Sequence, residues 1–139
     1  MNIHKKIEPT NHLKAKGWVI ANLLSLNHKI KRVERTGVIK AESPKGEEFY
    51  IMVHSLKDNN AWVVGKEGGE PFNLFHAFVR VPWLPANEDE TAFRVFIMHV
   101  QDVNDALYNW GQTHAPPPPS GFGYSIPHPH ENNWDILPQ

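Results

Sequence analysis

GVIKAESPKGEEFYIMVHSLKDNNAWVVGKEGGEPFNLFHAFVRV, residues 37–81, contains four short apolar runs separated by segments rich in Gly, Pro, Asn and Asp. Such runs are typical of strands joined by tight connections. They are Val38–Ala41, Phe49–Val53, Ala61–Val64 and Phe75–Val81. The first two flank Ser43-Pro44-Lys45-Gly46, which predicts a hairpin. The last is interrupted only by His76 and Arg80, which predicts a buried strand.

Helical patterns stand on both sides of these strands. From Asn11 to about Leu26 the apolar residues fall on one broad face, and Val100–Trp110 repeats the pattern on a shorter scale. Phe93–Met98 is predicted to be a further strand, whereas the charged segment Ile30–Arg35 favours at most a short one. The sequence therefore predicts an α/β fold with a mixed sheet of about five strands, flanked by an N-terminal and a C-terminal helix.

The length of 139 residues suits one domain with one sizeable core. We assign residues 11–110 to this domain and residues 1–10 to a flexible arm. Residues 111–139 contain Pro116–Pro119 and are predicted to form an extended tail without regular helix or sheet, which packs back on the domain through Trp134.

Composition excludes several classes of function. The chain has no cysteine, which rules out disulfides, thiolate catalysis and cysteine-based zinc sites. No apolar run approaches the roughly 20 residues needed to cross a bilayer, so no membrane partner is expected. The first residues lack an apolar segment behind their lysines, which argues against a signal peptide and favours a cytoplasmic location.

Charge is divided unevenly along the chain. Residues 1–46 carry ten Lys or Arg and three acids, whereas residues 47–139 carry four and twelve. Either the basic part binds nucleic acid or an acidic partner, or the two parts neutralise each other within the fold or across a homodimer. The candidate binding residues are Lys29, Lys31, Arg32, Arg35, Lys66 and Trp83.

The order of elements resembles small domains of the PD-(D/E)XK, or restriction-endonuclease-like, superfamily. The resemblance covers roughly residues 11–110 and the closing Asn133-Trp134-Asp135. It is carried by segments 51–55, 61–66 and 73–79, and by the strand at Phe96–Met98 that leads into a helix.

The resemblance also implies where catalytic residues would stand. Active nucleases of this superfamily hold Mg²⁺ with one carboxylate on the second core strand and another in an acid-x-Lys motif on the next. On this chain those positions fall at Val38, Met52 and His54, none of which has the required side chain. The resemblance therefore implies a domain without the ordinary catalytic site.

Three functions remain open from the sequence. The first is a catalytically inactive nuclease-like domain that binds nucleic acid or a protein, and which needs no cofactor. The second is a Mg²⁺-dependent endonuclease whose site has been rebuilt from Glu34, Glu42, Glu47 or Glu48. The third is an inhibitor or immunity-like protein partner. No metal site is predicted from the nine histidines, because the one close pair, His128 and His130, has no evident third ligand.

Overall fold

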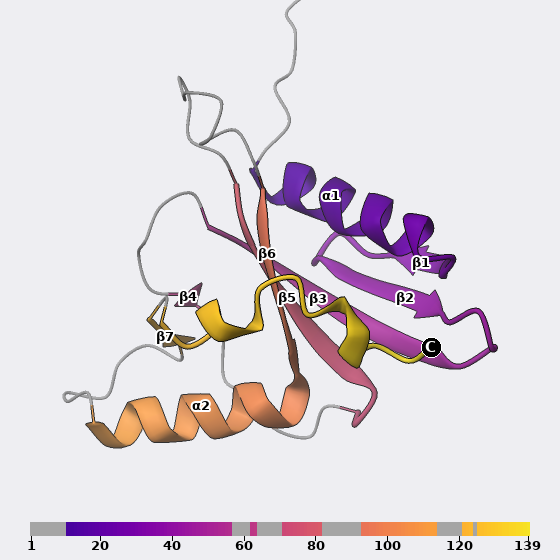
Figure 1. The fold of residues 1–139 in the computed structure, drawn as a ribbon. Helices are drawn as coiled ribbons and strands as arrows, with labels where there is room; N and C mark the ends of the chain where they lie inside the picture. Colours follow the sequence, from indigo (N-terminus) through magenta and orange to yellow (C-terminus); the bar gives the residue numbers. More distant parts are fainter. Residues whose placement is uncertain (1–10, 57–61, 64–70, 82–92, 114–120, 124) are drawn as a thin grey trace, which may run out of the picture.

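The computed structural model describes residues 11–56, 62–63, 71–81, 93–113, 121–123 and 125–139 (Figure 1). Helix α1 (Asn11–Ser25) precedes the strands and helix α2 (Val100–Thr113) follows them. The main sheet contains β1 (Lys29–Val33), β2 (Val38–Glu42), β3 (Glu48–Leu56), β5 (Leu74–Arg80) and β6 (Arg94–His99), side by side in that order. Strands β3 and β5 are parallel and all other neighbours are antiparallel. The predicted α/β fold with a mixed five-stranded sheet and flanking helices is confirmed.

The predicted hairpin is formed by β2 and β3. Its turn is closed by hydrogen bonds from the Ser43 N–H to the Glu47 carbonyl (2.8 Å) and from the Gly46 N–H to the Ser43 carbonyl (2.9 Å). Gly46 has φ +91°, a left-handed conformation that glycine adopts without steric cost. The Pro-Lys-Gly sequence therefore determines where the chain reverses.

The prediction for the run Ala61–Val64 was wrong about its place in the fold. Only Trp62–Val63 (β4) is described as a strand, and it pairs with Gly121–Phe122 (β7) in a separate two-stranded sheet. Both sides of β3 are already occupied, by β2 and β5, so the run cannot extend the main sheet there. The fifth strand of the main sheet is instead β1, from the charged segment.

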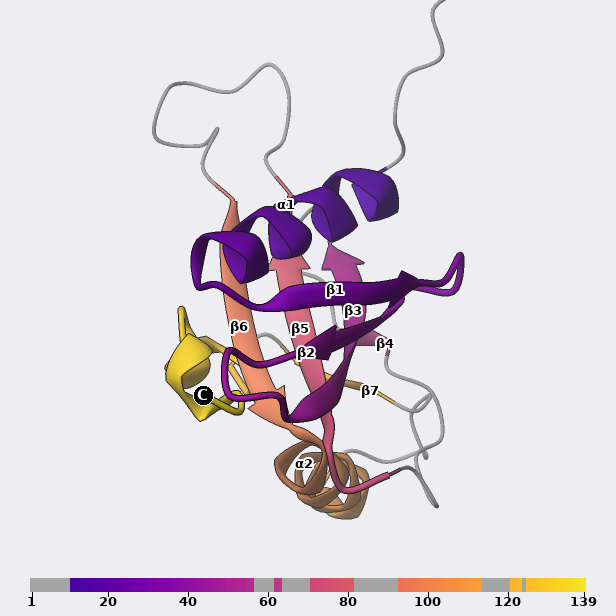
Figure 2. The same ribbon diagram turned by 90° about the vertical axis from the view of Figure 1, so that its right-hand side faces the viewer.

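The C-terminal tail has more structure than its proline content suggested. Besides β7 it forms two 3₁₀ turns, η2 (His128–His130) and η3 (Trp134–Ile136). Figures 1 and 2 show the part of the tail that contains η2 and η3 beside β6, at the edge of the sheet. The Asn132 N–H donates to the Val95 carbonyl (2.8 Å), and Arg94 makes two hydrogen bonds to Glu131 (3.0 and 2.8 Å). Pro116–Pro119 lie outside the described residues.

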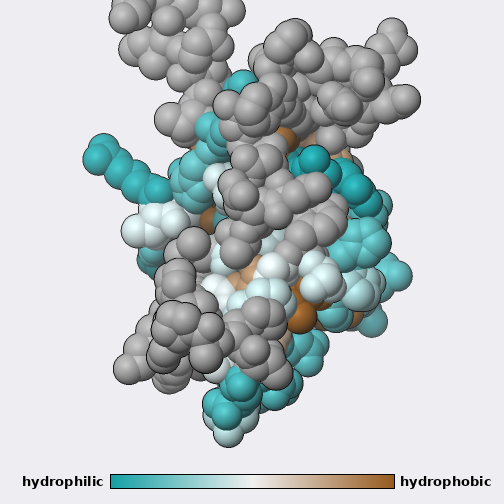
Figure 3. Space-filling model, turned by 90° about the vertical axis from the view of Figure 1, so that its left-hand side faces the viewer, coloured by the Kyte–Doolittle hydropathy of each residue, from teal (hydrophilic) through white to brown (hydrophobic). Residues whose placement is uncertain are grey.

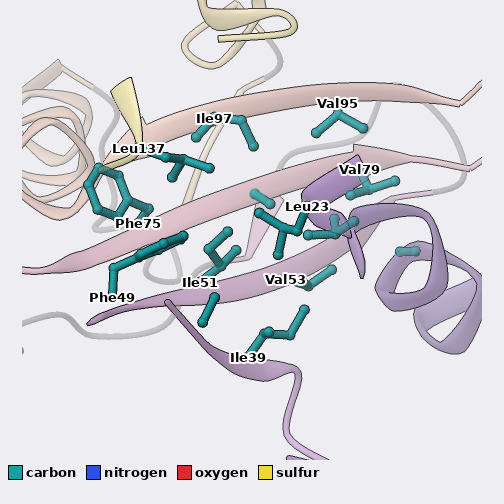
Figure 4. Packing of buried hydrophobic residues seen from close by; sticks show 14 of the residues in the cluster. Leu23, Ile39, Phe49, Ile51, Val53, Phe75, Val79, Val95, Ile97 and Leu137 are labelled. Atoms are coloured by element: carbon teal, nitrogen blue, oxygen red, sulfur yellow. The ribbon is translucent and has the colours of Figure 1, made fainter. Parts of the chain in front are cut away.

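The two faces of the sheet carry two apolar cores. On one face α1 lies across the sheet (Figure 2), and the alternate residues Phe49, Ile51 and Val53 of β3 point into this core with Leu23 (Figure 4). Leu137 is only 2% exposed, and it and Trp134 bring the C-terminal segment into the same core. The second core contains Trp62, Phe78 and Phe96, and residues of α2 pack against it.

The described residues on one side of the molecule are mixed in polarity (Figure 3). On the side of the molecule drawn in Figure 3, apolar residues of the described segments show as small patches among hydrophilic ones. Scattered apolar side chains of this kind are normal on a surface that faces water. Within the described residues, no helix is long and apolar enough to cross a membrane.

Candidate functional site

The three positions implied by the nuclease resemblance lie on one face of the β2–β3 hairpin. Val38 and Met52 are directly paired across the two strands, and His54 follows on the same face of β3. All three residues are half-buried. The positions that the resemblance singled out are therefore neighbours in space.

His54 is paired with a second histidine, His76 of β5. The His54 Nε2 lies 2.8 Å from the His76 Nδ1, and the two rings are 11° from parallel. His76 is fully buried. The Phe78 ring stacks on His54 at 4.8 Å between centroids. The sequence contained His76 as an interruption in an apolar run, but nothing in the sequence predicted the parallel pairing of β3 with β5 that brings it beside His54.

This environment keeps His54 neutral. Burial, followed by the nearby His76 and His12 rings, lowers the pKa of His54 from 6.5 to about 3. Part of the His54 residue is still reached by solvent, but its ring packs against both His76 and Phe78, and burial is the leading cause of the lowered pKa. A base with so low a pKa is poorly matched to proton abstraction near neutral pH.

His12, in the first turn of α1, lies near His54 and next to Gly37 in the β1–β2 turn. A Cβ placed on Gly37 would lie 2.7 Å from the His12 Cε1 and 3.0 Å from the Val53 carbonyl oxygen. Gly37 also has φ +98°. The lack of a side chain at Gly37 thus allows the β1–β2 turn to approach both α1 and β3. Burial and the nearby Lys16 lower the pKa of His12.

Three of the four glutamates considered for a rebuilt metal site are paired with cations, and the fourth, Glu47, is exposed just before β3. Glu42 pairs with Lys31 (3.2 Å), Glu34 with Arg32 (3.2 Å) and Glu48 with Lys40 (3.5 Å). Although Glu42 and Glu48 are cross-strand partners, each has its own lysine. In the part of the chain that the structure describes, no three His, Asp or Glu residues are grouped so that they could hold a metal ion.

The basic residues predicted to bind partners gather around β1, an edge strand of the main sheet. Lys29, Lys31 and Arg32 lie on the strand and Arg35 in the turn that follows, and all four are exposed. The Lys16 Nζ donates to the Glu34 carbonyl (3.4 Å), which joins α1 to the same turn. We call Lys16, Lys29, Lys31, Arg32 and Arg35 the β1 basic surface. The other two candidates, Lys66 and Trp83, lie outside the described residues.

Comparisons with known proteins do not extend this description: no protein-family model, curated protein or solved structure matches the chain. The relationship to PD-(D/E)XK nucleases stays a prediction from the sequence.

Proposed function

We propose that this chain is a non-catalytic nucleic-acid-binding module with a restriction-endonuclease-like scaffold, and that it binds phosphates through the β1 basic surface. The observation that carries the proposal is the exposed row of Lys29, Lys31 and Arg32 on an edge strand. Residues 11–46 contain eight Lys or Arg and two acids, so the surface around β1 keeps a positive balance. A positive electrostatic potential attracts a polyanion such as nucleic acid.

The ion pairs on this surface do not argue against phosphate binding. The side chain of Lys31 is 45% exposed and that of Arg32 is 59% exposed. Ion pairs between solvated side chains contribute at most about 1 kcal/mol, so that a phosphate can compete for these cations. Lys29 and Arg35 make no ion pair with another described residue and are available from the start.

The absence of catalysis is proposed from the side chains at the nuclease positions. Val38 and Met52 offer no oxygen ligand for Mg²⁺, and His54 is hydrogen-bonded to His76. The nearby Glu34, Glu42 and Glu48 are held by cations on the sheet. A rebuilt metal site at the hairpin would have to break these pairs.

The proposal is tested by measuring binding and cleavage on the same samples. Fluorescence anisotropy with labelled single- and double-stranded DNA and RNA, over a range of salt concentrations, reports binding; electrophoresis of the same nucleic acids with Mg²⁺ reports cleavage. We expect salt-sensitive binding and intact nucleic acid. Mg²⁺-dependent cutting that is lost in Glu42→Gln or Glu48→Gln would establish the rebuilt nuclease instead, and no binding at low salt would overturn the proposal.

A further inference from the structure

Two adjoining cavities lie between α2 and the C-terminal segment, apart from the β1 basic surface. Their volumes are about 510 and 450 Å³, and both are lined by Asp102 and His130. Each is in the size range of small-molecule sites, which is roughly 300–1,000 Å³. We call the two cavities together the α2 groove.

One half of the groove has aromatic and apolar walls. Phe72 is 78% exposed, which is unusual for an aromatic side chain, and its ring meets the His99 ring at 4.6 Å between centroids. Phe75 also packs against His99, at 5.2 Å between ring centroids. Ile136 and Pro138 of the C-terminal segment line the same cavity. In the other half, Trp110 of α2 is an aromatic wall.

His99 contributes a ring whose orientation is fixed by two hydrogen bonds. Its Nδ1 accepts a hydrogen bond from the Gln101 N–H (3.2 Å). The hydrogen-bond pattern therefore assigns the ring proton to Nε2, which donates to the Phe72 carbonyl (2.7 Å). Because both nitrogens are engaged, the His99 ring is held in place beside Phe72.

The charges on the groove are negative. Glu47, Asp102 and Asp105 line it, and no lysine or arginine does so among the described residues. Asp105 accepts a hydrogen bond from the Gln101 side chain (3.0 Å). Asp102, which both cavities share, makes no ion pair or side-chain hydrogen bond with another described residue.

The helix dipole alone does not explain this arrangement. Asp102 lies in the first turn of α2, where the dipole favours a carboxylate. However, Glu47 comes from the β2–β3 turn region and the exposed Phe72 from the segment before β5. Carboxylates and aromatic faces from separate elements meet at the same groove.

From this combination we propose that the α2 groove binds an organic cation, an ammonium or guanidinium group, with its charge at Asp102 and its carbon chain against Phe72 and Ile136. The carboxylate supplies a charge-assisted hydrogen bond to such a cation, and the exposed ring of Phe72 with the side chain of Ile136 supplies apolar surface for its carbon chain. Phosphates would be repelled by the same carboxylates. The groove is thus a site separate from the β1 basic surface and independent of nucleic-acid binding.

Isothermal titration calorimetry with two probes tests this site. L-arginine amide stands for a basic peptide and spermidine for a free polyamine, and the tighter binder identifies the source of the cation. We expect Asp102→Asn and Phe72→Ala each to weaken binding of the tighter probe by about tenfold, which corresponds to about 1.4 kcal/mol of binding free energy. Asp135→Asn is the matched control, because Asp135 is an exposed acid on η3 that does not line the groove.

The outcomes separate a site from a general charge effect. If Asp135→Asn weakens the probes as much as Asp102→Asn, the effect comes from net charge and the proposal fails. It also fails if neither probe binds at millimolar concentration. Preserved helical circular dichroism of the Phe72→Ala variant, together with the tenfold weaker probe binding, would assign the effect to the groove rather than to the fold.

Discussion

The Nε2 of His54 and the Nδ1 of His76 lie 2.8 Å apart across the parallel strands β3 and β5. A hydrogen bond between two ring nitrogens needs one donor and one acceptor, so the two rings cannot both be fully protonated while the bond persists. The Phe78 ring stacks on His54, so that the two histidines are packed against the face of the sheet. The position that the predicted nuclease resemblance assigns to a lysine is thus occupied by a neutral, packed ring.

The first prediction concerns stability and pH. Because the pKa of His54 falls from 6.5 to about 3 on folding, the unfolded chain binds more protons between these values. The stability that the neutral ring contributes is therefore fully present above pH 6.5 and declines as the pH falls from 6.5 towards 3, by up to about 1.4 kcal/mol per pH unit for this one group. Urea unfolding of the wild type and of His54→Gln between pH 7 and pH 5 measures the effect.

The expected result is a flatter pH dependence in His54→Gln, which does not titrate. Burial also lowers the pKa values of His12 and His28. Both remain in the variant, so that the difference in slope between the two proteins reports His54 together with its coupling to the neighbouring histidines. Identical slopes of unfolding free energy against pH in the two proteins would mean that folding does not change the pKa of His54.

A second prediction compares two glycines. Gly37→Ala should destabilise the fold by about 1–3 kcal/mol, because the residue has φ +98° and the new methyl group would meet the His12 ring. Gly17→Ala should stabilise it by about 0.5–1 kcal/mol, because Gly17 is inside α1 and has nothing within 4 Å of the added methyl group. Chemical denaturation measures both.

The double variant His12→Ala/Gly37→Ala separates the two causes of the expected destabilisation. Removing the ring should relieve the steric part and leave the backbone part. If the loss of unfolding free energy in the double variant equals the sum of the losses in the two single variants, the contact with His12 contributes nothing.

A third prediction tests how the C-terminal segment is attached. Leu137→Ala should cost about 2–4 kcal/mol, since this residue is 2% exposed and belongs to the main core. Ile136→Ala, one residue earlier and 37% exposed, is the control and should cost much less. Equal decreases in stability on thermal denaturation would mean that the segment does not contribute Leu137 to a packed core.

Much of the fold could be predicted because its signals are local. The Pro44-Lys45-Gly46 turn determined the hairpin, and apolar spacing located both helices. The position of Trp62 could not be predicted, because a run of apolar residues looks the same in a central strand and in a two-residue strand that packs on a sheet. Its partner Phe122 is far along the chain, beyond the proline run.

The candidate sites were predicted to different degrees. The exposed basic residues of β1 were visible as a charge pattern, since a highly charged strand can only lie at an edge or a surface. His76 and the α2 groove were missed. Both depend on contacts between distant segments, namely β3 with β5 and α2 with the C-terminal segment. No spacing in the sequence reports such contacts.

The salt dependence of nucleic-acid binding tests the central claim most directly. Each cation that neutralises a phosphate of duplex DNA adds about 0.9 to the slope of log K against log salt, so its removal should make that slope shallower by the same amount. The triple variant Lys29→Gln/Arg32→Gln/Arg35→Gln should therefore bind more weakly and with a slope shallower by about two to three. Glu34→Gln, which removes the acid paired with Arg32, should bind more tightly. A triple variant with the affinity and slope of the wild type would contradict phosphate binding at the β1 basic surface.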